Sequence, residues 1–147
     1  MELLKSLQIS ASGMTAERTR LEIISANIAN ASSTRSADGS GPYKRRMPVV
    51  ESETFDKVLA RRVANFSSQE VKIPTIVDVK EDDSQGPTVY DPTHPDADAR
   101  GYVQMPNVNV LTEMVDLMNA SRAYEANLNA IDAAKDMTLK SLELGRG

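Results

Sequence analysis

The sequence predicts an α+β fold in which two long terminal helices pair as a coiled coil, with a small β-containing domain inserted between them. Apolar residues recur at every seventh position near the N-terminus, and at steps of three and four with longer steps between them near the C-terminus. A seven-residue apolar repeat keeps one side of a helix facing a partner helix. The predicted organisation is a helix over 1–30, a loop over 31–42, a β-rich domain over 43–106 and a helix over 107–147.

The first helix carries an apolar stripe that one glycine interrupts. Gly13 costs about 1 kcal/mol relative to alanine inside a helix, so it indicates either the close approach of a neighbouring helix or a weak point. The polar run after Asn30 cannot continue the stripe, and asparagine tolerates the backbone conformation of a helix C-terminus. The stripe consists of Leu3, Leu7, Met14, Leu21, Ile24 and Ile28, of which Leu7, Met14, Leu21 and Ile28 lie seven residues apart.

The middle segment is predicted to form short strands. Apolar and polar residues alternate over 71–80, which is typical of a half-buried strand, and Pro74 places that strand at a sheet edge. A turn signal at 85–87 predicts that 88–90 returns antiparallel to this strand, and 101–104 is a third candidate.

Charge is distributed unevenly along the same segment. Residues 43–62 are mainly basic and residues 78–98 mainly acidic. Two interpretations remain open. The charges form two solvated faces, or the basic stretch of one subunit meets the acidic stretch of another and sets their register.

The second helix has a clear start. Asn109 is a good N-cap, and Glu113 and Asp116 lie in the early turns, where the helix dipole favours negative charge. At about 1.5 Å per residue such a helix reaches about 50 Å, so further copies are expected to bury its stripe. The stripe consists of Met114, Leu117, Tyr124, Leu128, Ile131 and Leu142.

Composition predicts no catalytic, metal or cofactor site. The chain of 147 residues has no cysteine, and its one histidine, His94, lies in a loop rich in proline and aspartate. A zinc site usually needs more than one nitrogen or sulfur ligand, and a calcium loop needs a glutamate at a fixed spacing that this loop lacks. The sequence therefore favours an assembly protein over an enzyme.

Nucleic-acid binding and membrane insertion are also not expected. The net charge is −4, aromatic residues make up 4% and tryptophan is absent, which argues against binding by a basic patch or by stacking. No apolar run approaches the 18 or so residues of a transmembrane helix. The first ten residues have no hydrophobic region of a secretory signal, so export without signal cleavage is expected if the protein leaves the cytoplasm.

Several motifs resemble one known family from end to end, most weakly over 50–85. The stretch from Ser10 to Leu21 and the element Asn27-Ile-Ala-Asn30 are similar to the N-terminal signature of bacterial flagellar rod and hook proteins. Six further motifs resemble those of proximal-rod proteins of the FlgC type. They are Gly41-Pro-Tyr-Lys-Arg-Arg46, His94-Pro-Asp-Ala-Asp98, Gly101-Tyr-Val103, Met105-Pro-Asn-Val-Asn109, Glu113-Met-Val-Asp116 and Arg122-Ala-Tyr-Glu-Ala-Asn127.

The resemblance implies a structural subunit of the flagellar basal-body rod, in the cell envelope and periplasm. It implies terminal helices that pack with copies of the chain and with other rod proteins into a drive shaft that transmits motor torque. It also implies export through the flagellar type III apparatus. The alternatives are another flagellar axial protein or a coiled-coil adaptor or chaperone.

Two sets of residues are carried over from the resemblance. The assembly interface would comprise Leu7, Met14, Leu21, Ile28, Met114, Leu117, Tyr124, Leu128 and Ile131. The family motif positions are Asn27, Asn30, Asn107, Asn109, Glu113, Arg122, Tyr124, Glu125 and Asn127.

Overall fold

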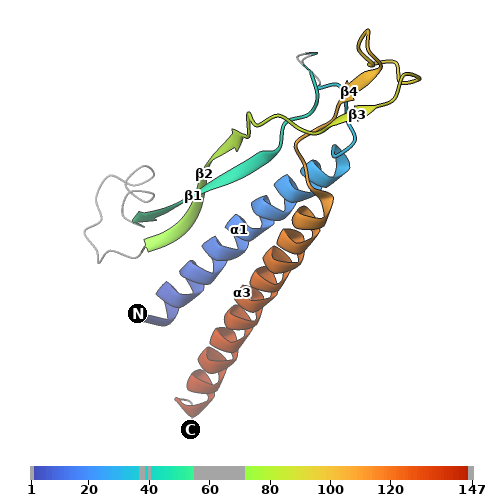
Figure 1. Ribbon diagram of the computed structural model, residues 1–147. Helices are drawn as coiled ribbons and strands as arrows, with labels where there is room; N and C mark the ends of the chain where they lie inside the picture. Colours follow the sequence, from blue (N-terminus) through green and yellow to red (C-terminus); the bar gives the residue numbers. More distant parts are fainter. Residues whose placement is uncertain (1, 37–38, 40, 55–71, 146–147) are drawn as a thin grey trace. The chain divides into compact units, whose positions relative to one another are not determined.

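One long helix lies at each end of the chain, and the strands of two small sheets lie between them in the sequence (Figure 1). The computed structural model describes residues 2–36, 39, 41–54 and 72–145. The α+β class with long terminal helices is therefore confirmed. The elements are α1 (Glu2–Ala29), β1 (Arg46–Thr54), β2 (Lys72–Glu81), β3 (Thr88–Tyr90), β4 (Tyr102–Gln104) and α3 (Val110–Leu144).

The chain divides into two compact units, each of which contains part of both helices. The first unit comprises Met1–Arg20, Val50–Val77 and Asn119–Gly147. The second unit comprises Leu21–Val49 and Asp78–Met118.

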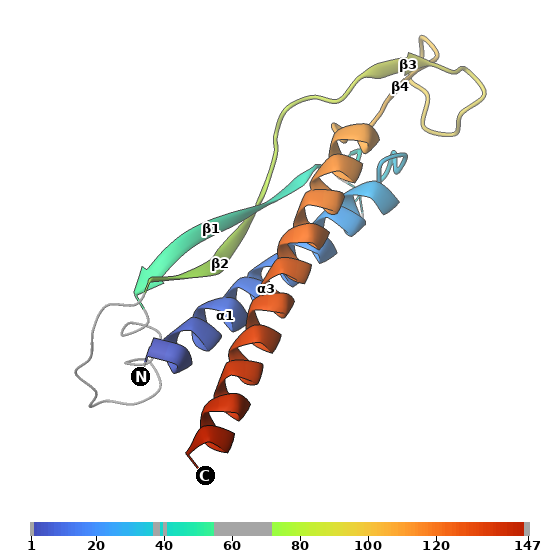
Figure 2. The same cartoon turned by 90° about the horizontal axis from the view of Figure 1, so that it is seen from below.

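In the first unit, α1 and α3 run in opposite directions and approach closely at Gly13 (Figure 2). Gly13 is buried, and a β-carbon at this position would lie 3.0 Å from the Asn127 Nδ2 atom and 3.2 Å from its Cγ atom. The helix continues unbroken through the glycine. Close approach is therefore the correct one of the two interpretations of Gly13.

The strand pairing differs from the sequence prediction. Residues 88–90 do not return to the strand at 72–81, and the prediction that they do is wrong. Instead β3 pairs antiparallel with β4, with Val89 opposite Val103, while β2 pairs with β1. Val71, at the start of the predicted strand, lies outside the described residues.

The reason for the wrong pairing lies in the segment between β2 and β3. Residues 82–87 form no hairpin turn. Gly86 packs against the backbone of Met105 and Pro106, where a β-carbon would collide with the Met105 carbonyl. The Met105 amide donates to the Pro87 carbonyl at 2.9 Å. Because Gly86 has no β-carbon, the backbone can pass close to Met105 and Pro106. The chain therefore continues alongside β4 instead of turning back to β2.

Aliphatic side chains and two large polar ones are buried in the described part of the chain. Among the described residues, the buried apolar side chains are Ile23, Ile24, Ile73, Val103, Ala120 and Ala134. The largest fully buried side chains are Glu113, Asn27 and Pro106. Polar groups of this size are rarely buried without hydrogen-bond partners, so Asn27 and Glu113 and the residues around them form the candidate functional site.

Within the described part of the chain, neither helix contains a stretch apolar enough to cross a lipid bilayer.

Candidate functional site

Two buried and two half-buried polar side chains of the second unit meet where α1 ends, β1 begins and α3 begins. We call the side chains of Asn27, Tyr43, Arg45 and Glu113, with the backbone of Arg46, the polar junction. Asn27 is 1% exposed and uses both ends of its amide. Its Oδ1 atom accepts from the Arg46 amide and from the Tyr43 hydroxyl, both at 2.9 Å. Its Nδ2 atom donates to the Arg46 carbonyl at 2.8 Å and to Glu113 Oε2 at 3.0 Å.

The Asn27 amide therefore binds both backbone groups of Arg46, as a residue of a neighbouring strand would. An asparagine amide offers two donor hydrogens and an acceptor oxygen with two lone pairs, and all of them are used here. The last turns of α1 are in this way joined to the first residue of β1.

Glu113 is the buried charge of the polar junction, with 1% of its side chain exposed. Its Oε1 atom accepts from Nε of Arg45 at 2.7 Å and forms an ion pair with Nη2 of Arg45 at 2.7 Å, while Oε2 accepts from Asn27. The Arg45 side chain is 26% exposed and also lies 3.7 Å from Asp116. A buried carboxylate that keeps a charged partner and further hydrogen bonds avoids most of its desolvation cost, but it becomes costly once a partner is removed.

Two further asparagines organise the entry to α3. Asn107 Oδ1 accepts from the Arg45 amide at 2.7 Å, and its Nδ2 donates to the Asp82 carbonyl and to the Ser84 hydroxyl. Asn109 Oδ1 accepts from the amides of Leu111 and Thr112 at 3.1 and 3.3 Å. The predicted N-cap at Asn109 is thus confirmed.

The polar junction also acts on Tyr43. Burial raises the pKa of the Tyr43 hydroxyl, with smaller opposing and reinforcing effects from Arg46 and from Glu81 and Glu113. The hydroxyl therefore stays protonated and keeps donating to Asn27 across the neutral range.

Tyr43 and Arg45 were not predicted as members of this site. Arg45 lies in the basic stretch of the sequence, and the Gly41–Arg46 motif, which contains both residues, was the signal that could have indicated them. Asn30, by contrast, acts locally at the end of α1, where its amide donates to the Ala26 carbonyl at 2.8 Å.

The remaining motif residues lie on the part of α3 in the first unit. Asn127 contacts Gly13, as described above. Tyr124 is half-buried, while Arg122 and Glu125 are exposed.

The predicted assembly positions are not the innermost ones. Leu7, Met14, Leu21 and Ile28 are half-buried, as are Leu117, Tyr124 and Ile131. Met114 and Leu128 are 52% and 42% exposed. The positions of α3 that are buried or packed against α1 are instead small or polar, and they too recur at every seventh residue: Glu113, Ala120, Asn127 and Ala134.

Large apolar side chains remain on the surface of α3. In the second unit, Leu111, Met114, Val115 and Met118 are exposed and share one side of the helix, since they follow the spacing of successive turns. In the first unit, the large apolar side chains exposed on α3 are those of Leu128, Met137, Leu139, Leu142 and Leu144. Apolar surface gathered in this way marks interaction sites more often than scattered exposure does.

Several charges of the basic and acidic stretches pair within the chain. Lys44 binds Asp83, and Arg46 lies 3.4 Å from Glu81. These basic residues therefore already have acidic partners in their own subunit, a third arrangement beside the two that the sequence left open. Lys57, Arg61 and Arg62 lie outside the described residues.

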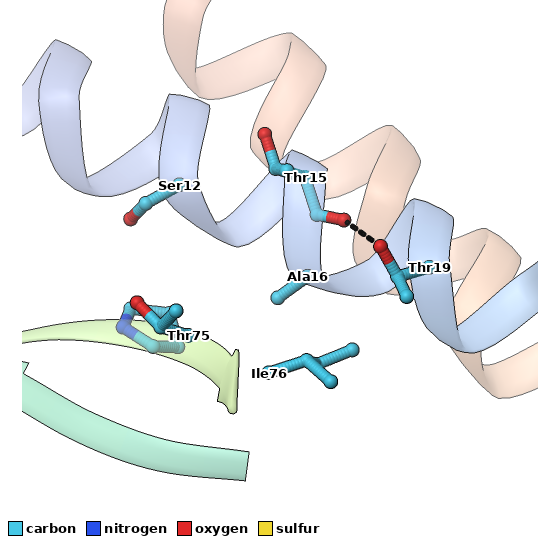
Figure 3. Close-up of a pocket in the computed structure, with 7 residues that line it drawn as sticks. Ser12, Thr15, Ala16, Thr19, Thr75 and Ile76 are labelled. Carbon is cyan, nitrogen blue, oxygen red and sulfur yellow. Dashed lines mark hydrogen bonds between the residues drawn. The ribbon is translucent and has the colours of Figure 1, made fainter. Parts of the chain in front are cut away.

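A groove of about 250 Å³ lies between α1 and β2 in the first unit (Figure 3). It is lined by Ser12, Thr15, Ala16, Thr19, Pro74, Thr75 and Ile76. The three hydroxyls on α1 donate to carbonyls of their own helix, Thr19 to Thr15 for example, so the groove offers mainly methyl groups.

His94 lies in the loop between β3 and β4. Its Nδ1 atom accepts from the Asp96 amide at 3.1 Å, which makes it part of a turn. Over the described ranges, no three residues of the metal-binding types come together as a metal site would require.

Comparison with known proteins identifies the family. A family model described as "Flagella basal body rod protein" matches residues 7–35, and one described as "Flagellar basal body rod FlgEFG protein C-terminal" matches residues 99–144. The flagellar basal-body rod protein FlgC of Bacillus subtilis (strain 168) is 44% identical, over 99% of this chain and 100% of its own length. The chain belongs to the flagellar basal-body rod family.

Other rod proteins of this family agree over the full length. The FlgC of Borreliella burgdorferi is 38% identical over 100% of both chains, and that of Escherichia coli O6:H1 is 38% identical over 99% of this chain and 100% of its own. The protein is accordingly a structural subunit of the basal-body rod. The first matched segment covers most of α1, and the second covers β4, Asn107 and all of α3, which carries Glu113.

Proposed function

We propose that this rod subunit assembles through α1 and α3, with copies of itself and with other rod proteins, into the shaft that transmits motor torque. The two apolar stripes of the sequence are the proposed assembly interface. The observation that carries the proposal is the set of large apolar side chains exposed on α3, among them Leu111 at 74% and Leu128 at 42%. Burying such side chains against neighbours would stabilise an assembly by roughly 1.5–3 kcal/mol for each one fully buried.

A helical seam of this kind suits a mechanical role. Torque passes through a stack of subunits only if each interface resists shear, and interdigitated side chains at the density of a protein interior have little freedom to slide. In this proposal, the terminal helices pair as an antiparallel coiled coil. Gly13 and Asn127 support this pairing, since their contact brings the two backbones close together.

We also infer that the subunit reaches the cell envelope through the flagellar type III export apparatus, without signal cleavage. Family membership supports this route, because rod subunits have to pass the membrane before they assemble. Deletion of a dedicated export component should then leave the full-length chain in the cytoplasm, with an unchanged N-terminus by mass spectrometry.

Electron cryotomography of cells that lack only this gene tests the proposal. The expected result is a membrane ring with no rod or filament beyond it, and a plasmid copy should restore both. Intact flagella in the deletion strain would reject the rod function and favour the coiled-coil adaptor.

A further inference from the structure

The buried side of α3 repeats so regularly that apolar packing alone does not fix its alignment with α1. The positions of α3 that are buried or packed against α1 lie seven residues apart, and they are Glu113, Ala120, Asn127 and Ala134. Two of these four residues are alanine. When a buried seam repeats every seven residues, moving one helix by one repeat places a similar seam against the same partner. Something other than the alanines has to select the observed alignment.

Contacts in the two units agree on one alignment. In the second unit Asn27 binds Glu113, and in the first unit Gly13 faces Asn127. The same number of residues separates Gly13 from Asn27 as separates Glu113 from Asn127. Each unit, taken by itself, therefore has the same antiparallel offset between the residues of α1 and those of α3.

Displacing α3 by one repeat would retain small side chains at both places. Ala134 would come to Gly13 and Ala120 to Asn27, and both are smaller than the residues they replace. Glu113, however, would move by about 10 Å along the helix axis and leave Arg45 and Asn27. A carboxylate taken from its buried partners is strongly unfavourable unless it finds new ones.

We propose that Glu113 is the residue that determines the register of the terminal helices. Its two hydrogen bonds, from Arg45 and Asn27, and its ion pair with Arg45 exist in the observed alignment and are lost in the displaced one. Single buried polar residues set the alignment of coiled coils in the same way, at some cost in stability. This inference rests on the helix pairing of the proposed function.

The register matters for assembly because many identical seams meet in one structure. A subunit whose α3 is displaced by one repeat would present its exposed side chains about 10 Å away from where its neighbours need them. Arg45 lies next to the first residue of β1, so the same contact ties the register of the helices to the position of that strand.

Cysteine pairs can report the register, because the chain has no cysteine of its own. The G13C/N127C variant reports the observed alignment, since a β-carbon at 13 would lie 3.2 Å from the Cγ atom of Asn127. The G13C/N127A/A134C variant reports the displaced one, and N127A gives the new side chain the same room. Full-length protein is oxidised, and intrachain disulfides are separated from interchain ones on non-reducing gels.

With Glu113 present, the first pair should close and the second should stay reduced. Adding E113L should raise closure of the second pair by about tenfold or more, because leucine fits an apolar seam in either alignment. D116L is the matched control. It removes the same charge from the second carboxylate near Arg45, and it should leave the second pair reduced.

Unchanged closure of both pairs in E113L would overturn the register proposal. If E113L loses its helical circular dichroism, E113Q decides, because glutamine keeps the volume and removes the charge. A severalfold rise of the second pair in E113Q supports the proposal, and no rise overturns it. Failure of the first pair to close with Glu113 present would instead reject the helix pairing, and the register proposal with it.

Discussion

The Asn27 side chain joins three segments of the second unit through four hydrogen bonds while it is 1% exposed. N27A should lower the free energy of unfolding by about 2–4 kcal/mol, because buried partners lose their hydrogen bonds and a void remains. Urea unfolding followed by circular dichroism measures the loss.

N30A is the matched control, since Asn30 lies one turn later and serves only the end of α1 and Ser33. It should cost about 1 kcal/mol or less. Equal losses in the two variants would show that the polar junction adds nothing beyond an ordinary helix end.

Asp96 gives the second unit a pH dependence. The Thr34 hydroxyl donates to Asp96 at 2.7 Å, and Arg35 binds the same carboxylate. The hydrogen bond from Thr34, followed by Arg35 and then His94, lowers the pKa of Asp96 below its ordinary value. Since the unfolded chain then binds the proton more tightly, the stabilisation is complete above about pH 4 and is lost as the pH falls through the lowered pKa.

Carboxyl chemical shifts recorded against pH check this prediction. Asp96 should titrate below the ordinary pKa of an aspartate in an unfolded chain, which is about 3.9. D96N should remove the acid-induced loosening of the contact with Thr34. A titration of Asp96 at the ordinary value, or above it, would contradict the role given to Thr34.

The close approach of α1 and α3 should limit the stability that an alanine at position 13 can add to α1. Alanine is favoured over glycine in a helix by about 1 kcal/mol, but at this position its methyl group would meet Asn127 at 3.0 Å. G13A should therefore gain the full stability of about 1 kcal/mol only in a chain whose Asn127 side chain has been removed.

A double-mutant cycle on thermal unfolding measures the coupling. G13A should stabilise the N127A background by about 1 kcal/mol and the original chain by clearly less, or not at all. The same gain in both backgrounds would mean that Asn127 does not limit the space at Gly13.

The helices could be predicted from sequence more fully than the strands could. Heptad spacing and the Asn109 cap located α1 and α3 because both signals depend on neighbouring residues of the chain. The pairing of β3 depends on Gly86 packing against a backbone that is distant in sequence. β1 was not predicted as a strand, since few apolar residues alternate along Arg46–Thr54.

Periodicity does not by itself identify the residues of α3 that are buried within the single chain. It selected large apolar residues, whereas the residues buried within the chain are alanines and Glu113. Small residues allow two backbones to approach, and Glu113 is buried only because Arg45 arrives from elsewhere in the chain. Neither condition can be recognised from a count of apolar positions.

If α3 forms the proposed interface, a substitution at one of its exposed apolar residues should impair assembly of the rod without lowering the stability of the free chain. Leu128 is 42% exposed, so replacing it costs the free chain little, but an interface that buries it would also have to bury the new charge. L128D should block incorporation into the rod and abolish motility, while the free chain keeps its β3–β4 pairing in hydrogen exchange. N129D introduces the same charge at the next, exposed position and should assemble. Rod incorporation is scored by immunoblot of isolated basal bodies, and L128D found there at the level of N129D would remove Leu128 from the interface.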